Sequence, residues 1–305
     1  MIDIVMVGGI AACGWEDRLS ANIATPHRIR IYPCDLAETE VLVGSPVTRA
    51  MVAQAPRLRL VHSSGAGFDS IDRTALPEGV PLCNVFHHER AMAEYVIMTM
   101  LAMDRRLFYQ DRNLRSGIWT GTCVDGSPVA SELEGRTLGI IGLGHIGREA
   151  ARLASAFDMK ILSLRSGFAR AELESLLAES DYVLLSCPLS EQTRKLIGAA
   201  ELAGMKSSAG LINVARGDVV DEAALYEALR SKRIRAAAID VWYQYPRGGA
   251  TVLPSRFPFQ DLDNVIMTPH SSGWTERVVA RRFVDIAANI DRLVAGEPLQ
   301  NLVRA

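Results

Sequence analysis

Short apolar runs alternate with longer stretches of helical periodicity along most of the chain, beginning at residues 2–7. This alternation is typical of βα units whose parallel strands are buried on both faces. A first series of expected strands comprises 2–7, 28–32, 40–43, 58–62 and 81–85. A second series comprises 137–141, 160–164, 182–186, 210–213, 236–240 and 265–268. The pattern predicts an α/β protein with two doubly wound parallel sheets.

Two longer helical patterns mark the domain boundaries. One covers about 91–114, between the two series of strands, and the other covers about 276–295 near the end of the chain. No strand accompanies the last helix, so we expect it to pack on the first domain. This predicts a discontinuous domain of residues 1–96 plus 274–305, with a second domain, 97–273, inserted into it.

Composition narrows the classes of partner. The 305 residues are about twice the roughly 150 of a typical domain, which agrees with two domains. A net charge of −2 without a Lys/Arg block argues against nucleic acid and membrane surfaces. The five cysteines are never spaced as CxxC, which disfavours disulfides and structural zinc. With no basic leader and no long apolar run, we expect a cytoplasmic protein that binds a small molecule.

A glycine motif, Gly142-Leu143-Gly144-His145-Ile146-Gly147, lies between an expected strand and an expected helix. Three glycines alone can mark a tight turn. In this context, however, they are typical of the loop that holds a dinucleotide pyrophosphate at a helix N-terminus. The inserted domain is therefore predicted to be a Rossmann cofactor domain, and the outer domain a flavodoxin-like substrate domain.

The end of the next strand indicates which dinucleotide binds. An acidic residue there would bind the ribose hydroxyls of NAD and repel a 2′-phosphate. This chain instead has Arg165-Ser166. A guanidinium pairs with a phosphate and stacks on an adenine, although a solvated surface arginine is the alternative. We predict NADP(H) as the cofactor.

Several further segments resemble the D-isomer-specific 2-hydroxyacid dehydrogenase family, in the branch of NADP-dependent glyoxylate and hydroxypyruvate reductases. The resemblance covers nearly the whole chain, in the order of the family. The segments are 62–72, Ala93-Glu94-Tyr95, 188–193, 213–217 with 219–222, Ile239-Asp240-Val241-Trp242 and Thr268-Pro269-His270. The activity implied is reduction of a small 2-oxo acid to the 2-hydroxy acid by hydride transfer.

The resemblance also implies roles for single residues. Arg216 would hold the substrate through its carboxylate and carbonyl oxygens, and His270 would protonate the carbonyl oxygen. The backbone N–H groups near Ala66 and Gly67 would bind the substrate carboxylate, although glycines there could equally serve a turn.

Asp240 would lie near the nicotinamide, with strand-end packing as the alternative. The residues expected at the cofactor are Gly142, Gly144, His145, Ile146, Gly147, Arg165, Ser166, Cys187, Pro188, Thr193, Val214, Ala215, Arg216, Asp240, His270, Ser272 and Gly273.

One position departs from the family pattern. The family pairs its histidine with a carboxylate five residues after the aspartate matched by Asp240, and that position here is Tyr245. A neutral hydroxyl stabilises an imidazolium less than a carboxylate does. Three hypotheses follow: Tyr245 supports His270 and reduction is favoured at lower pH, another carboxylate such as Glu89 takes its place, or the chain binds NADP without turnover.

Glu89 belongs to His87-His88-Glu89, where helix capping is the simpler interpretation. No further ligands with suitable spacing accompany that cluster, so no metal is expected. The alternatives to a 2-oxo acid reductase are a non-catalytic, corepressor-like NADP sensor and a formate or phosphite dehydrogenase. The family also implies a homodimer with the 91–114 helix at the contact.

Overall fold

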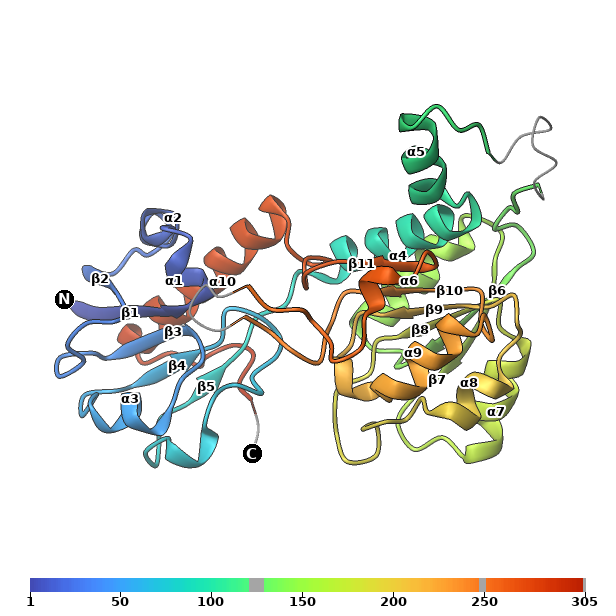
Figure 1. Ribbon diagram of the computed structural model, residues 1–305. Helices are drawn as coiled ribbons and strands as arrows, with labels where there is room; N and C mark the ends of the chain where they lie inside the picture. Colours follow the sequence, from blue (N-terminus) through green and yellow to red (C-terminus); the bar gives the residue numbers. More distant parts are fainter. Residues whose placement is uncertain (121–128, 247–250, 304–305) are drawn as a thin grey trace. The chain divides into compact units, whose positions relative to one another are not determined.

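The computed structural model describes residues 1–120, 129–246 and 251–303 (Figure 1). The chain divides into two compact units. Unit 1 comprises Met1–His87 and Thr275–Ala305, and unit 2 comprises His88–Trp274. Unit 2 begins at His88 rather than at the expected residue 97, because the helix that follows packs its buried face, including Met92 and Val96, into the core of unit 2.

Unit 1 contains a five-stranded parallel sheet with the order β2-β1-β3-β4-β5, which is the flavodoxin-like order. The strands are β1 (Ile2–Gly8), β2 (His27–Ile31), β3 (Val41–Ser45), β4 (Leu60–His62) and β5 (Leu82–Cys83). The helices are α1 (Gly9–Ala12), α2 (Glu16–Ser20), α3 (Arg49–Ala53), the 3-10 helix η1 (Arg73–Ala75) and α10 (Glu276–Ala295).

Successive residues of β1 serve two cores on opposite faces of this sheet. Ile4 and Met6 pack with α10 residues in one core, and Val5 and Val7 pack with α3 residues in the other. Side chains alternate between the faces of a strand, so an uninterrupted apolar run is needed when both faces are covered.

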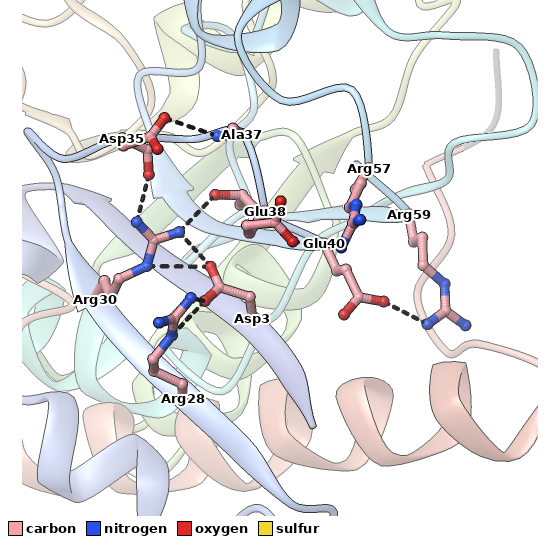
Figure 2. A network of polar contacts seen from close by, with 10 residues as sticks. Asp3, Arg28, Arg30, Asp35, Ala37, Glu38, Glu40, Arg57 and Arg59 are labelled. Atoms are coloured by element: carbon pink, nitrogen blue, oxygen red, sulfur yellow. Dashed lines mark hydrogen bonds and ion pairs between the residues drawn. The ribbon is translucent and has the colours of Figure 1, made fainter.

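A buried acidic residue near the start of β1 joins it to β2 (Figure 2). Asp3 is 6% exposed and pairs in register with Arg28. Its carboxylate accepts from Arg28 Nε at 2.7 Å and also from Arg30. The hydrogen bond to Asp3 is the main reason why the pKa of Arg30 is raised. This buried charge is therefore compensated, and the network holds the edge strand β2 to β1.

Unit 2 contains a six-stranded parallel sheet with the order β11-β10-β9-β8-β6-β7. Its strands are β6 (Thr137–Ile141), β7 (Lys160–Leu164), β8 (Tyr182–Leu185), β9 (Gly210–Asn213), β10 (Ala236–Ile239) and β11 (Val265–Met267). Its helices are α4 (Glu89–Asp104), α5 (Leu107–Arg115), α6 (His145–Ser155), α7 (Arg170–Glu179), α8 (Ala199–Gly204), α9 (Glu222–Arg230) and the 3-10 helices η2 (Gly217–Val219) and η3 (Phe259–Asp261).

The direction in which strands are added reverses at β6, which lies between β7 and β8. Ligands of open α/β sheets bind beyond the carboxyl ends of the strands at such a reversal. The predicted fold class, two parallel-sheet α/β domains with a Rossmann cofactor domain, is confirmed.

The expectation of one helix over 91–114 is wrong. Helix α4 ends at Asp104, and α5 begins at Leu107. Arg106, between them, has a φ of 48°, a left-handed conformation that interrupts a right-handed helix. Apolar residues continue past the break, but on α5 they are exposed, as Leu107, Phe108 and Leu114 show. Within the described ranges, no helix is long and apolar enough to cross a membrane.

Candidate active site

The glycine motif forms the turn between β6 and α6, at the strand reversal of unit 2. Gly142 has a φ of 103°, and a Cβ there would lie 2.5 Å from the backbone nitrogen of Cys187. A Cβ on Gly147 would lie 2.5 Å from the carbonyl oxygen of Gly142. These two positions require glycine, because the backbone turns left-handed at one and packs too closely for a side chain at the other.

Gly144 is different, because a Cβ built on it meets no atom within 4 Å. It is the N-cap of α6, and no side chain caps this helix. The start of α6 thus has room beside Gly144 and no side-chain cap, two features that binding of a pyrophosphate requires. His145 begins the helix and is exposed, whereas Ile146 is half-buried. These features fit a dinucleotide.

Arg165 and Ser166 follow β7 directly, and both are exposed. Leu164, the last residue of β7, pairs in register with Ile141, the last residue of β6. Arg165 and the glycine loop therefore leave the sheet at the same edge. Arg165 has no ion pair or hydrogen bond with any other residue that the structure describes. Its guanidinium is available to a phosphate on the adenosine side of a dinucleotide.

Arg216 lies in a loop that one buried side chain holds. Asn213, the last residue of β9, donates from Nδ2 to the carbonyl oxygen of Arg216 at 3.0 Å, and its Oδ1 accepts from the N–H of Ala215 at 3.0 Å. Arg216 is half-buried, and its Nη1 donates to the carbonyl oxygen of Ala215 at 2.7 Å. The amide of Asn213 thus fixes the backbone from which the guanidinium extends.

Asp240 holds the loop that carries His270. It is fully buried. Its Oδ1 accepts from Thr268 Oγ1 at 2.5 Å and from the N–H of Ser271 at 2.9 Å, while its Oδ2 accepts from the N–H of Ser272 at 3.0 Å. His270 has a φ of 59°, an unfavourable conformation for a residue with a Cβ. The three hydrogen bonds to Asp240 flank that residue and hold it there.

His270 and Tyr245 form a hydrogen-bonded pair. Tyr245 Oη lies 3.0 Å from His270 Nδ1, and it also accepts from the backbone N–H of Trp242 at 3.1 Å. No carboxylate among the described residues, Glu89 included, forms a hydrogen bond with His270. Tyr245 therefore orients the imidazole, and Nε2 is the ring nitrogen left to face a reactant.

Electrostatics at this pair favour the neutral imidazole. Desolvation lowers the pKa of His270, the charge of Arg216 lowers it further, and Asp240 acts in the opposite direction. Desolvation raises the pKa of Tyr245, so the hydroxyl stays protonated at neutral pH. Arg216 influences both groups, which means that the predicted catalytic residues of unit 2 lie within electrostatic reach of one another.

The predicted substrate segment of unit 1, residues 62–72, contains a loop, 63–67, in which three carbonyl oxygens accept hydrogen bonds from within the unit. The carbonyl oxygen of Ala66 accepts from Asn84 Nδ2 at 2.9 Å, that of Gly65 from the N–H of Val85 at 3.2 Å, and that of Gly67 from Ser63 Oγ at 2.8 Å. By contrast, the N–H groups of three loop residues have no acceptor in the described part of the chain. They belong to Ser64, Ala66 and Gly67. A loop of this kind presents donors to an anion.

A buried histidine at the start of the segment 62–72, with no predicted role of its own, supports this loop. His62 is fully buried, and desolvation lowers its pKa to about 4. Its Nδ1 donates to the carbonyl oxygen of Ser63 at 2.9 Å, and its Nε2 accepts from Asn289 Nδ2 at 3.0 Å. Because Asn289 belongs to α10, the histidine joins the loop to that helix. Only its position directly before the loop could have indicated this role.

Other residues expected at the cofactor use their side chains elsewhere. Cys187, Val214 and Ala215 pack in the two cores of unit 2. Thr193 Oγ1 donates to the carbonyl oxygen of Pro188 at 2.6 Å, which shapes the loop after β8. A Cβ on Gly273 would lie 3.1 Å from His88 Cβ. These residues can therefore contact a dinucleotide through their backbone atoms.

Ser272 is an exception, because its Oγ is buried without a hydrogen-bond partner among the described residues. A buried hydroxyl of this kind calls for a partner outside the chain, such as a ligand or a water molecule.

The residues of the His87-His88-Glu89 cluster have different environments. His87 pairs through Nε2 with Asp285 Oδ2 at 2.7 Å in unit 1, while Glu89 is the first residue of α4. Tyr95, which belongs to the matched segment Ala93-Glu94-Tyr95 but had no predicted role, places its hydroxyl 2.8 Å from Thr268 Oγ1.

Comparison with known proteins finds a matching family and several relatives. The profile of the NAD-binding domain of D-isomer specific 2-hydroxyacid dehydrogenases matches residues 97–272. The chain is 36% identical to glyoxylate/hydroxypyruvate reductase B of Pectobacterium carotovorum, over 88% of this chain and 86% of that protein.

It is 34% identical to D-3-phosphoglycerate dehydrogenase of Methanocaldococcus jannaschii, over 88% of this chain, but it spans only about half (52%) of that relative. The structure of a D-isomer specific 2-hydroxyacid dehydrogenase family protein from Aeromonas salmonicida superposes with a TM-score of 0.82 and 28% identity, covering 99% of both chains.

Proposed function

Because the chain belongs to the D-isomer-specific 2-hydroxyacid dehydrogenase family, we propose that it uses NADPH to reduce a small 2-oxo acid, of the glyoxylate or hydroxypyruvate type, to the 2-hydroxy acid. A chiral product would have the D configuration. The observation that carries the proposal is the pair His270–Tyr245, oriented by hydrogen bonds and close to the charge of Arg216. A proton donor and a carboxylate-binding cation are the two groups that this reaction needs from the protein.

Bound NADPH would supply the hydride. The N–H groups of Ala66 and Gly67 and the guanidinium of Arg216 would bind the substrate carboxylate, and Arg216 would also polarise the carbonyl group. The imidazolium of His270 would donate its Nε2 proton to the carbonyl oxygen. The remaining Nδ1–H would then donate to Tyr245 Oη, an oxygen that also accepts from Trp242. A hydroxyl oxygen has two acceptor positions, so Tyr245 can serve both donors.

The first test measures initial rates with NADPH and NADH on glyoxylate, hydroxypyruvate, pyruvate and a bulky aryl 2-oxo acid. We expect turnover of the small acids, with NADPH preferred by about 10- to 100-fold, because a charge-assisted hydrogen bond contributes about 1.5–3 kcal/mol. Arg165→Asp should reverse this preference, since a carboxylate repels the 2′-phosphate and binds ribose hydroxyls. Equal use of both cofactors before and after the substitution would contradict the assignment of Arg165.

Lys160→Met provides the matched control for Arg165→Asp. Lys160 is an exposed cation at the other end of the same strand, β7. It begins the strand, whereas cofactors bind beyond the carboxyl ends of strands. The control should leave the ratio of NADPH to NADH efficiency unchanged.

The pairing of Tyr245 with His270 predicts how the rate of reduction depends on pH. Reduction needs the imidazolium, so its rate should fall as pH rises through the pKa of His270, which lies below the ordinary value. Tyr245→Glu should raise this pKa by about 1–2 units, because a nearby carboxylate stabilises the cation, and should therefore extend reduction to higher pH. Tyr245→Phe should lower kcat by about tenfold through loss of one hydrogen bond to a charged group. Profiles of kcat against pH that are identical in all three proteins would rule out support of His270 by Tyr245.

The tyrosine also favours a second candidate function, a non-catalytic NADP-binding regulator, because the family's acidic partner is absent from this position. Tight NADPH binding by calorimetry without turnover of any 2-oxo acid would support that candidate. Intact Arg216 and His270 support the reductase instead.

We also propose that the protein acts as a cytoplasmic homodimer. The apolar side chains on and after α5, such as Phe108 at 58% exposure and Trp119 at 64%, are the surface that a second copy would cover. Leu107, Leu114 and Ile118 are exposed as well, and exposed apolar residues gathered in this way are typical of contact surfaces.

A further inference from the structure

A threonine two residues before His270 takes part in several hydrogen bonds of unit 2. Thr268 directly follows β11. Its Oγ1 lies 2.8 Å from the hydroxyl of Tyr95 and 2.5 Å from Asp240 Oδ1. Its carbonyl oxygen accepts from Trp242 Nε1 at 2.8 Å. Thr268 therefore connects α4, which carries Tyr95, to the segment that follows β10.

The direction of the side-chain hydrogen bonds follows from the number of protons available. Asp240 accepts from three donors, and an ionised carboxylate can only accept. The single proton of the Thr268 hydroxyl therefore goes to Asp240, and the hydroxyl of Tyr95 must donate to Thr268 Oγ1. Tyr95 remains a donor at every working pH, because desolvation raises its pKa to about 12. Tyr95 thus fixes the orientation of the Thr268 side chain.

The side chain of Tyr95 is rigidly packed. It is 8% exposed and lies in one core of unit 2 together with Met92 and Val96 of the same helix. His270, by contrast, lies in a loop and has a φ of 59°. Such a conformation persists only where the surrounding structure holds it. Tyr95 supplies a contact from the core to the segment that carries this residue.

A first series of hydrogen bonds leads from Thr268 to the backbone around His270. The carboxylate of Asp240, which accepts from Thr268, also accepts from the N–H groups of Ser271 and Ser272 at 2.9 and 3.0 Å. These contacts lie on both sides of His270 in the sequence. The position of Asp240 therefore determines the position of the loop.

A second series leads from Thr268 to the imidazole itself. The indole of Trp242 donates to the carbonyl oxygen of Thr268, and the backbone N–H of Trp242 donates to Tyr245 Oη at 3.1 Å. Tyr245 Oη lies 3.0 Å from His270 Nδ1. The residue that Tyr95 holds is therefore connected to His270 through both the backbone and the ring.

We propose that Tyr95 is a positioning residue for proton transfer by His270. Its hydroxyl fixes Thr268. Thr268 in turn holds the loop of the histidine through Asp240 and the orientation of the imidazole through Trp242. This inference rests on the proposed reductase function and adds to the same site a residue that acts through its neighbours.

The first test removes only the hydroxyl of Tyr95. Tyr95→Phe should lower kcat by about 5- to 50-fold, an effect between the loss of one hydrogen bond and a misplacement of about 1 Å at the reacting atoms. The KM for NADPH should stay within about twofold of the wild-type value, because the glycine loop and Arg165 are untouched. A wild-type kcat in Tyr95→Phe would overturn the proposal.

Variants of Thr268 test whether Tyr95 acts through this residue. Thr268→Val removes the hydroxyl and should lower kcat at least as much as Tyr95→Phe does. Thr268→Ser keeps the hydroxyl and should retain most of the rate. The double variant Tyr95→Phe/Thr268→Val should be no slower than Thr268→Val alone, because the two residues form one connected unit. Effects that multiply in the double variant would show that the residues act independently, contrary to the proposal.

The titration of His270 distinguishes positioning from general damage. Desolvation and the charge of Arg216 lower the pKa of His270, whereas Asp240 raises it. Tyr95→Phe loosens the support from Asp240 and Tyr245, so the pKa should fall further and the pH limb of reduction should move to lower pH. A loosened fold would instead admit water, and the pKa would rise towards its ordinary value. An unchanged or raised pKa would therefore exclude a positioning role.

Proton NMR of the ring C–H signals gives this pKa without any turnover. The chain has six histidines, and the signal of His270 is the one that His270→Gln lacks. Tyr182→Phe is the matched control, because Tyr182 is another buried tyrosine of unit 2 whose hydroxyl accepts from Arg235 Nη2 at 3.0 Å. It begins β8, away from the carboxyl ends of the strands. The control should leave both kcat and the pKa of His270 unchanged.

The two measurements separate failure of this inference from failure of the proposed function. A wild-type chain that reduces 2-oxo acids, with the same kcat and the same pKa of His270 in Tyr95→Phe, overturns the role of Tyr95 and leaves the reductase standing. Absence of turnover of every 2-oxo acid overturns the reductase. A pKa of His270 that falls in Tyr95→Phe but not in Tyr182→Phe would still support the positioning of the imidazole by Tyr95.

Discussion

Replacing His270 with glutamine is expected to lower kcat for 2-oxo acid reduction by about 10²- to 10⁴-fold, the usual contribution of a general acid. Glutamine can hydrogen-bond to Tyr245 but cannot carry a proton to the substrate. The measurement is the steady-state rate of NADPH oxidation over a range of pH. The rate of the wild-type chain should fall as pH rises through the lowered pKa of His270, whereas the residual rate of His270→Gln should lack this transition.

Fold and cofactor binding provide the control for this variant. Asp240 holds the loop of His270 through Thr268, Ser271 and Ser272 rather than through the imidazole. The melting temperature and the affinity for NADPH should therefore remain close to wild-type values. A His270→Gln protein with wild-type kcat would exclude His270 as the proton donor.

Replacing Arg216 with methionine is expected to lower kcat/KM by about 30- to 5,000-fold, because loss of one partner from a desolvated, hydrogen-bonded charge pair costs about 2–5 kcal/mol. Methionine preserves much of the apolar stem. Arg216→Lys should recover little, since a lysine cannot form the bidentate pair with a carboxylate.

A second result distinguishes Arg216 from a residue that only maintains the fold. The charge of Arg216 lowers the pKa of His270, so its removal should raise that pKa and shift the pH limb of reduction upward. Arg230→Met is the control, because Arg230 is exposed on α9 and pairs with Glu227. Loss of activity in Arg216→Met without any shift of the pH limb would contradict the proximity of Arg216 to the acid.

The elements of this fold follow closely from local signals. Continuous apolar runs predict the strands, and β6, β7 and β9 begin and end at the expected residues, as does α10. The prediction of a single helix over 91–114 was wrong, because helical periodicity shows only which residues share a face. It does not reveal a single residue in a left-handed conformation, such as Arg106.

The candidate site, too, could be predicted from the sequence only in part. The glycine loop and Arg165 follow from spacing along one βα unit, and Tyr245 was identified by its distance in sequence from Asp240. The role of Asp240 was not predictable. Its carboxylate contacts a loop about 30 residues further along the chain, and no periodic pattern connects the two.

The sequence by itself therefore determined the two α/β domains, the family and the residue types of the candidate site, because these depend on periodicity, turn chemistry and motif order. Only the tertiary structure decided that Asp240 fixes the loop of His270, that Tyr245 Oη is shared between Trp242 and the imidazole, and that Tyr95 contacts Thr268. The physical reason is that such contacts join residues distant in the chain, and packing and hydrogen-bond geometry select them after the local elements have formed.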